Sequence, residues 1–302
     1  MRVTLIHNPT AGEDDHAADA LRSLVAEAGH EVSYTSMRQP GWEEALGDAG
    51  DLIVVAGGDG SVGKVFREVA TKGTPVTLLP VGSANNIARS LAIPDVDVER
   101  LVYGWPDGER RRLDIGEATA SWGGTLFVES IGGGIFGEVL SRADGVESAG
   151  VEVEGDEKVG LGVEMLREVI EGIPAREWRV EVDGDDLSGE LLAVEAMNIG
   201  QMGPNLPLAL QADPGDGLLD VVLIRDEDRS NLVAYLSARM RELDPGLPGL
   251  RRSRGERIVL GPPDDLRLHV DDRFWPAERD GRHDGTVVVT CGPSLTVVVP
   301  RV

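Results

Sequence analysis

A strand, a glycine-rich turn and a helix follow one another directly between residues 51 and 69, in the stretch DLIVVAGGDGSVGKVFREV. A continuous apolar run is typical of a strand that is buried on both faces, as in parallel sheets covered by helices. Strands are expected at 2–8, 30–36, 51–58 and 74–82, and helices at 14–29, 41–50 and 61–73. This alternation predicts an α/β domain with a doubly wound parallel sheet.

The pattern changes after residue 122. Short β-rich runs separated by Gly, Pro and Asp turns fill residues 123–302, which is typical of an antiparallel β-sandwich. We therefore expect an α/β nucleotide-binding domain at 1–122 and a β-sandwich substrate domain at 123–302. Helical patterns occur within it at 158–173 and 229–243, and the acidic segment 144–157 is expected to be a loop. The last strand, at 294–300, either pairs within the chain, returning to the first domain, or pairs across a homodimer.

Charge and composition exclude several classes of function. The formal net charge is −24, which argues against a nucleic-acid partner because phosphate backbones are bound through Lys and Arg clusters. The same charge limits contact with an anionic membrane surface to a transient one made through a local apolar or basic patch. The single cysteine, the absence of an apolar run of about 18 residues and the absence of a signal-peptide pattern predict a cytoplasmic protein, peripheral at most at the inner membrane face.

The glycine-rich turn after the third strand fits three motifs. As a P-loop, Gly58 to Lys64 lacks the hydroxyl that holds Mg²⁺, because Val65 follows. As a dinucleotide finger, Gly58, Gly60 and Gly63 lack the acidic ribose ligand, since no carboxylate occurs from residue 69 to 94. The five histidines also lack the spacing of a zinc site. Both nucleotide motifs are thus disfavoured, and the GGDG turn of another kinase superfamily remains.

Three glycine-rich turns follow the first, third and fourth strands: NPTAG at 8–12, GGDGS at 57–61 and LPVGSANNIARSL at 79–91. Such turns meet at one edge of a parallel sheet and offer backbone N–H groups to an anion. This ordered set resembles the diacylglycerol kinase catalytic family, which includes sphingosine kinases and bacterial lipid kinases, and more distantly the NAD kinases. The resemblance continues through segments at 111–117, 129–139, 213–224 and 268–275, and so covers nearly the whole chain.

The resemblance implies ATP and Mg²⁺ as cofactors. Residues carried over to the nucleotide site are Asn8, Pro9, Thr10, Ala11, Gly12, Ser36, Gly57, Gly58, Asp59, Gly60, Ser61, Lys64, Gly82, Ser83 and Asn85. Asp59 would orient its loop or hold Mg²⁺ through water. Asp216, with the backbone oxygens of Asp213 and Leu218, would hold a structural Mg²⁺, although an acidic hairpin turn explains the same residues.

The match departs from the family around the acceptor. The family places its proton-accepting carboxylate in a DGE turn, where this chain has Asp271, Asp272 and Arg273. We expect Asp271 or Asp272 to accept the proton, with Asp59 as a further catalytic residue. Gly63 and Lys64 replace a polar pair of the family, while Asn86 and Phe136 stand where aspartates are usual. One interpretation is a divergent branch of the family, in which Lys64 contacts a phosphate or pairs with one of the two aspartates. The other is that Lys64 is a solvated helix residue.

The function predicted from these residues is ATP-dependent phosphorylation of a lipid hydroxyl, with a diacylglycerol-like acceptor first. Phe274 and Trp275 flank the expected catalytic turn and are candidates for a wall of the lipid site. Two alternatives remain open. Arg273 and Lys64 could recognise a phosphate on a soluble acceptor, and the loss of the family glutamate is compatible with a nucleotide-binding regulator that transfers nothing.

Overall fold

The computed structural model describes residues 1–11, 17–148, 155–241, 243, 246, 248–277 and 285–302. They form two compact units, of which the first comprises Met1–Ile115 with Pro293–Val302 and the second Gly116–Gly292. Strands β5 (Glu109–Ala120) and β17 (Val287–Val299) each contribute residues to both units. None of the helices in the described part of the chain is long and apolar enough to cross a membrane.

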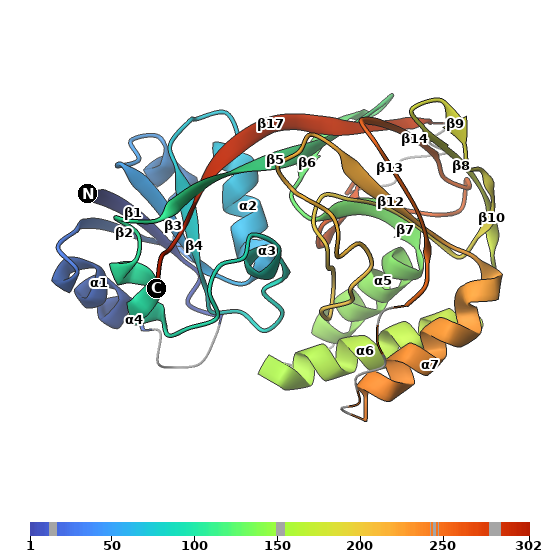
Figure 1. Ribbon diagram of the computed structural model, residues 1–302, viewed down its shortest axis with the longest axis horizontal. Helices are drawn as coiled ribbons and strands as arrows, with labels where there is room; N and C mark the ends of the chain where they lie inside the picture. The colour runs from blue at the N-terminus through green and yellow to red at the C-terminus, as the bar shows by residue number, and fades with distance from the viewer. Residues whose placement is uncertain (12–16, 149–154, 242, 244–245, 247, 278–284) are drawn as a thin grey trace. The chain divides into compact units, whose positions relative to one another are not determined.

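The first unit is built on a parallel sheet with strand order β4-β3-β1-β2. Its strands are β1 (Arg2–His7), β2 (Glu31–Ser36), β3 (Leu52–Gly57) and β4 (Val76–Pro80). Its helices are α1 (Ala18–Glu27), η2 (Trp42–Leu46), α2 (Asp59–Val69), α3 (Asn86–Ser90) and α4 (Val98–Tyr103). Every residue of β3 is buried, as expected for a sheet covered on both faces (Figure 1). The predicted doubly wound α/β fold is confirmed.

Helix α2 forms because apolar residues recur at helical spacing after the glycine-rich turn. Its buried side chains include those at positions i, i+3, i+4 and i+7, namely Val62, Val65, Phe66 and Val69. The helix begins at Asp59, directly after Gly58. The first-turn N–H groups of a helix have no acceptor within the helix, so this turn delivers free donors to the edge of the sheet.

The C-terminal part of β17 lies beside β4 in the first unit. Val297 pairs with Val76 in a parallel register, and the Thr77 hydroxyl donates a hydrogen bond to the Val298 carbonyl oxygen at 2.7 Å. Residues near the end of the sequence therefore complete the sheet that the first 80 residues begin.

The second unit contains two layers of antiparallel strands. One sheet has the order β13-β12-β11-β7-β15-β16, with β7 (Ser130–Gly134), β11 (Ala193–Met197), β12 (Leu219–Ile224), β13 (Arg251–Gly255), β15 (Leu268–Val270) and β16 (Arg273–Trp275). The other layer comprises parts of β5 and β17 with β6 (Gly123–Phe127), β8 (Arg176–Val182), β9 (Asp185–Asp186), β10 (Gly189–Leu191) and β14 (Arg257–Gly261). Phe127, Trp178 and Val221 belong to the core that the two layers share, so the predicted β-sandwich is confirmed.

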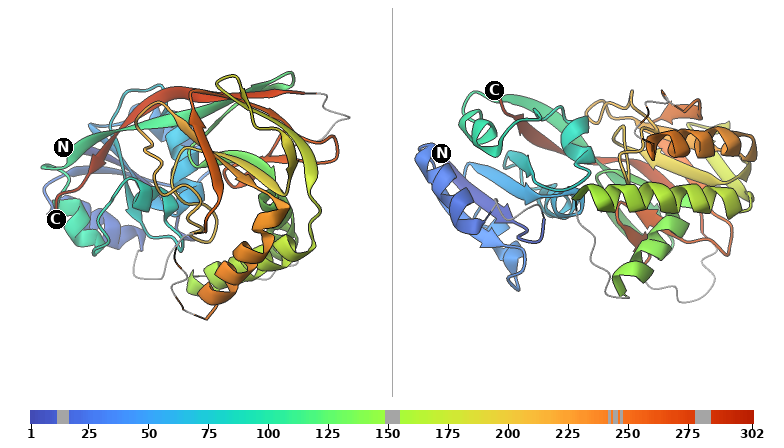
Figure 2. Two further views of the ribbon diagram at one scale, coloured as in Figure 1. Left: turned by 45° about the vertical axis from the view of Figure 1, so that its right-hand side comes forward. Right: turned by 90° about the horizontal axis from the view of Figure 1, so that it is seen from below.

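Three helices cover the other face of the six-stranded sheet. They are α5 (Ile135–Ser148), α6 (Gly155–Gly172) and α7 (Arg229–Arg239), the last preceded by the short η3 (Asp226–Asp228). Leu166 and Leu236 pack there against Met197 and Val222 in a second core. The two views of Figure 2 show the three helices gathered on this side of the unit.

The loop predicted at 144–157 is wrong where the structure describes it. Helix α5 continues to Ser148 and α6 starts at Gly155, while residues 149–154 lie outside the described part. Ion pairs on the neighbouring parts of the two helices are compatible with this helical structure. Arg142 contacts Glu138 one turn earlier at 3.2 Å and Glu168 on α6 at 3.6 Å.

Candidate functional site

The glycine-rich turns of the first unit meet at the carboxyl ends of β1, β3 and β4. His7 lies opposite Ala56, and Gly57 lies opposite Pro80, so the three strands end side by side. A Cβ atom on Gly82 would lie 2.4 Å from the Cα atom of Gly58. The second and third turns therefore touch through their backbones, and only glycine at position 82 allows this approach.

Asn8 joins the first turn to the second. Its side-chain N–H donates to the Ser61 hydroxyl at 2.8 Å. Its side-chain oxygen accepts hydrogen bonds from the Thr10 backbone N–H at 3.1 Å and from the Thr10 hydroxyl at 2.7 Å. These bonds fix the NPTA turn against the start of α2. Pro9 and Thr10 are exposed there, and Gly12 lies outside the described residues.

Asp59 joins the second turn to the third. Its two carboxylate oxygens accept hydrogen bonds from the backbone N–H groups of Asn86 and Ile87, both at 2.9 Å. Burial raises the pKa of the Asp59 carboxyl, and these N–H groups oppose the rise. Of the roles expected for Asp59, orienting the loops is the one that this geometry supports.

Asn85 shapes the third turn from within. The residue has a φ of 53°, and its side-chain amide donates to the carbonyl oxygens of Pro80 at 3.1 Å and Gly82 at 2.6 Å. Its side-chain oxygen accepts the Gly82 N–H at 3.1 Å. Asn85 thus supports the predicted nucleotide loop, while the neighbouring Ser83 is exposed on it.

The side chain of Lys64 contacts η2. Its ammonium nitrogen lies 3.4 Å from a Glu43 carboxylate oxygen and 4.9 Å from the centre of the Trp42 ring. These contacts place Lys64 beside η2. Its contact with a phosphate stays a prediction, which the proposed nucleotide site does not include. Ser36, at the end of β2, accepts the Arg38 N–H at 3.3 Å.

In the second unit, Asp271 and Asp272 form the two-residue turn between β15 and β16. The Asp271 carboxylate accepts backbone N–H groups of Val128, Glu129 and Ser130 at 3.1, 2.8 and 3.4 Å. Asp271 therefore anchors the turn to the start of β7. Asp272 is exposed at the same turn.

The buried pair of Glu195 and His269 contacts this turn through a hydrogen bond. His269 Nε2 lies 2.8 Å from Glu195 Oε1, and both side chains are almost completely buried. The other ring nitrogen of His269 bonds the Asp271 carbonyl oxygen at 3.1 Å. The pKa of Glu195 is raised, because the effect of burial outweighs that of the nearby His269. Burial lowers the pKa of His269, but Glu195 and Asp271 together outweigh burial, so this pKa is raised as well.

The region expected to form a lipid wall is closely packed. Trp275 packs against Trp122 with ring centres 5.3 Å apart, and Arg267 lies 3.8 Å from the centre of the Phe274 ring. The cavity beside Trp275 measures about 30 Å³, far below the roughly 300 Å³ of a small ligand pocket. Arg273, which replaces the family glutamate, donates to Thr125 Oγ1 at 3.0 Å. Neither the small cavity nor the hydrogen bond of Arg273 supports a ligand contact at Phe274, Trp275 or Arg273.

Of the magnesium ligands predicted at Asp213, Asp216 and Leu218, the Asp216 carboxylate is engaged by protein groups. Asp216 Oδ1 accepts the Leu218 N–H at 3.0 Å, and Asp216 Oδ2 pairs with the Arg254 guanidinium. Arg254 Nε lies 3.6 Å from Asp220, its cross-strand partner. Because a guanidinium already joins two carboxylates, the oxygens are paired with a protein cation. Within the described ranges, no three Asp, Glu, His or Cys side chains converge to hold a metal.

Sequence reasoning did not single out three of the residues that shape these sites: Glu195, Arg254 and Gly132. His269 was considered only as one of five histidines without metal spacing. One signal was present, since three consecutive glycines in the strand pattern at 132–134 mark a close approach of neighbouring groups. The partners that approach there were not readable from the sequence, because the strand order decides them.

Comparison with solved structures shows which proteins share this fold. A crystal structure of a putative diacylglycerol kinase from Bacillus anthracis matches 99% of this chain and 97% of its own, with a TM-score of 0.70 at 19% identity. Yeast NADH kinase, solved with NADH, matches all of this chain and 84% of its own, with a TM-score of 0.55 at 12% identity. The chain therefore has the fold that diacylglycerol kinases share with NAD kinases.

Sequence comparison shows the family. Residues 2–118 match the diacylglycerol kinase catalytic domain, and residues 151–300 match the YegS C-terminal NAD kinase beta sandwich-like domain. The chain belongs to the diacylglycerol kinase catalytic domain family, as its motifs predicted. The diacylglycerol kinases of Bacillus subtilis (strain 168) and Staphylococcus aureus (strain bovine RF122 / ET3-1) are 26% and 24% identical to it, over 90% of this chain and 90% and 86% of theirs.

Proposed function

We propose that this protein is a lipid kinase that transfers the γ-phosphate of ATP to the hydroxyl of a diacylglycerol-like lipid. The observation that carries the proposal is the fixed set of glycine-rich turns in the first unit. Asn8 and Asp59 hold these turns together, and the approach of Gly58 to Gly82 leaves the loop backbone open to phosphates. The names of the relatives support the lipid acceptor.

The residues proposed to line the nucleotide site belong to the three turns and to the end of β2: Asn8, Pro9, Thr10, Ala11, Gly12, Ser36, Gly57, Gly58, Asp59, Gly60, Ser61, Gly82, Ser83 and Asn85. Asn8, Asp59 and Asn85 would act by fixing the loops. Mg²⁺ bound with ATP supplies positive charge to the phosphates during transfer. We assign that ion to the phosphates and to no protein carboxylate of the described residues.

We assign the proton-accepting role to Asp272. Transfer to an alcohol requires a group that takes the hydroxyl proton, and a carboxylate performs this role when its oxygens are accessible. Three backbone N–H groups bind the Asp271 carboxylate, whereas Asp272 is exposed on the same turn. Asp271 then holds the turn and Asp272 meets the acceptor.

The test is transfer of label from γ-³²P-ATP to a lipid extract in mixed micelles. We compare the unchanged protein with Asp272→Asn and with Asp185→Asn, which removes an exposed carboxylate from β9. Labelled lipid that falls by about 10²- to 10⁴-fold in Asp272→Asn alone is expected for loss of a general base. ATP binding without labelled lipid would favour a regulator. Label on a soluble compound instead would favour the other alternative, although Lys64 and Arg273 already contact protein groups.

A further inference from the structure

Glu195 and His269 lie on strands that are not neighbours. Strand β7 runs between β11 and β15, and its Gly132 is the register partner of both residues, Glu195 on one side and His269 on the other. The two side chains nevertheless meet, with 2.8 Å between Glu195 Oε1 and His269 Nε2. The contact therefore passes over the backbone of the strand that separates them.

Glycine at position 132 makes this contact possible. A Cβ atom there would lie 2.0 Å from the Val194 carbonyl oxygen and 2.4 Å from Glu195 Cδ. Any side chain on Gly132 would thus occupy the space in which the carboxyl and imidazole groups meet. The buried pair has a dedicated place in the sheet, next to the Phe136 ring, whose centre is 6.4 Å from that of His269.

The same imidazole reaches the turn that carries Asp272. A carbonyl oxygen only accepts hydrogen bonds, so His269 Nδ1 donates its proton to the Asp271 carbonyl oxygen at 3.1 Å. Asp271 has a φ of 50°, in the left-handed region that two-residue hairpin turns require and that Asp tolerates. Glu195 fixes the ring through its other nitrogen, as carboxylates do for functional histidines.

The geometry points to Glu195 and His269 as positioning residues for the proposed kinase reaction. They act through the Asp271 carbonyl to hold Asp272 in the orientation that accepts the proton of the lipid hydroxyl. The inference rests on the proposed function for its activity readout. The hold on the turn itself is a property of the fold and can be measured without any substrate.

The first experiment measures transfer kinetics and thermal unfolding for His269→Gln, Glu195→Gln and Glu195→Ala. The control is Val222→Ala, which removes buried apolar volume from β12 in the same sheet. We expect kcat to fall about 10- to 100-fold in His269→Gln with the KM for ATP unchanged. Glu195→Gln should retain more activity than Glu195→Ala, because an amide still bonds the ring. Equal loss of kcat in Val222→Ala at equal loss of Tm would overturn the inference.

The second experiment measures amide hydrogen exchange at residues 271–273 in the same variants. The Asp271 N–H bonds the Ser130 carbonyl oxygen at 2.9 Å, so its exchange reports on the hold of the turn. Exchange should accelerate at least 10-fold in His269→Gln and stay unchanged in Val222→Ala; unchanged exchange in both refutes the positioning role. Transfer that survives in Asp272→Asn would contradict both the assignment of the base and the role of His269 in orienting it.

Discussion

Asp271 and Asp272 are adjacent in the sequence, yet their carboxylates have opposite surroundings. Backbone N–H groups of three consecutive residues bind Asp271, while Asp272 is exposed. A carboxylate whose oxygens accept several N–H groups is fixed in one orientation and offers few lone pairs to an incoming proton. Two identical residue types therefore divide between anchoring and proposed catalysis, according to the neighbours that the fold gives them.

The buried Glu195–His269 pair predicts a pH dependence of stability. Both pKa values are raised in the folded protein, so the folded state binds these protons more tightly than the unfolded chain. The stabilisation from His269 is complete below its ordinary pKa of about 6.5 and is lost as pH rises through its raised pKa. In Glu195→Gln, burial dominates and lowers the pKa of His269, so its contribution should instead increase as pH rises towards neutrality.

Urea unfolding of the unchanged protein and of Glu195→Gln at several pH values between 5.5 and 8.5 checks this sign. The difference between the two proteins isolates the pair, because other titrating groups such as His30 contribute to both curves. The free energy difference should shrink as pH rises. Parallel curves would mean that Glu195 does not change the protonation of His269.

At the scale of elements, the approach of the two glycine-rich turns gives a second prediction. Gly82→Ala would force a Cβ atom to within 2.4 Å of the Gly58 Cα, so the turns must separate. We expect a loss of about 1–3 kcal/mol in unfolding free energy, together with weaker ATP binding measured by calorimetry. In Gly160→Ala, on α6, nothing lies within 4 Å of the new atom, and the helix should gain about 0.5–1 kcal/mol. Unchanged ATP affinity in Gly82→Ala would mean that these turns do not bind the nucleotide.

The antiparallel pairing of β12 with β13 gives a third prediction. Arg254 pairs with Asp216 and lies near Asp220. Burial raises the pKa of Asp220, and the nearby Arg252 opposes this rise. Thermal unfolding without nucleotide should therefore respond equally to MgCl₂ and to NaCl of the same ionic strength. Arg254→Ala should lower Tm by several degrees, since it removes the cation that pairs with Asp216 and lies beside the buried Asp220. A saturable Mg²⁺ effect that Asp216→Asn removes would show a metal site after all.

The sequence predicts a feature well when the residues that form it lie close together in the chain, and poorly when they lie far apart. The glycine-rich turns could be located because each follows an apolar strand, and parallel strands end at one edge. The contact of Lys64 with Glu43 could not be predicted, because Glu43 lies on η2, outside the motif that contains Lys64. Glu195 and His269 are 74 positions apart and meet across a third strand, so only the strand order brings them together.

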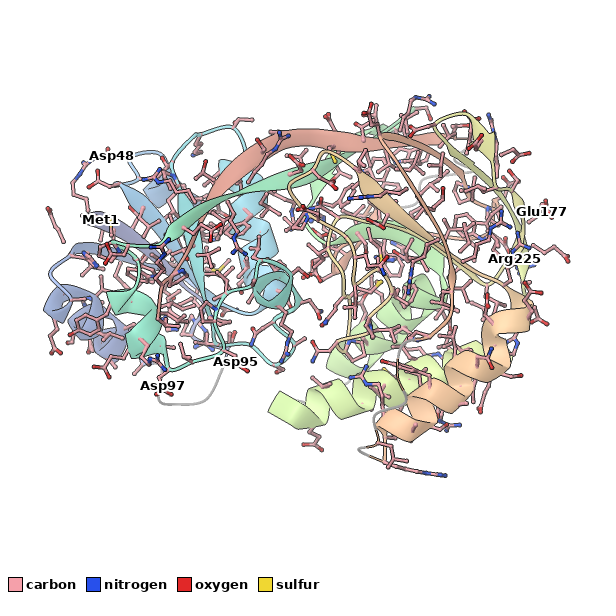
Figure 3. The ribbon with its side chains drawn as sticks, in the orientation of Figure 1. Met1, Asp48, Asp95, Asp97, Glu177 and Arg225 are labelled. Carbon is pink, nitrogen blue, oxygen red and sulfur yellow. The ribbon has the colours of Figure 1, made fainter. Side chains whose placement is uncertain are left out.

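For the whole molecule, the net charge of −24 predicts that salt stabilises the fold. Acidic side chains such as Asp48, Asp95, Asp97 and Glu177 are exposed and lie at the periphery of their units (Figure 3). Their mutual repulsion acts over about 30 Å at 10 mM salt and about 8 Å at 150 mM. Exposed ion pairs such as Arg2–Asp51 contribute little in comparison.

We expect Tm to rise by a few degrees between 10 and 150 mM NaCl, and KCl to give the same rise. Calorimetry at fixed pH measures the effect, and the match between the two salts serves as the control for ion-specific binding. A Tm that falls with salt would show that attraction between paired charges outweighs the repulsion.

The place of β17 has a consequence for how the protein is made. The edge of β4 is covered by Val297 and Val298, more than 200 positions further along the chain (Figure 1). While the ribosome is still translating the second unit, β4 remains an open edge strand, which readily pairs with other chains. The first unit emerges first yet closes last, so its exposure to aggregation grows with the time that translation takes to reach residues 293–302.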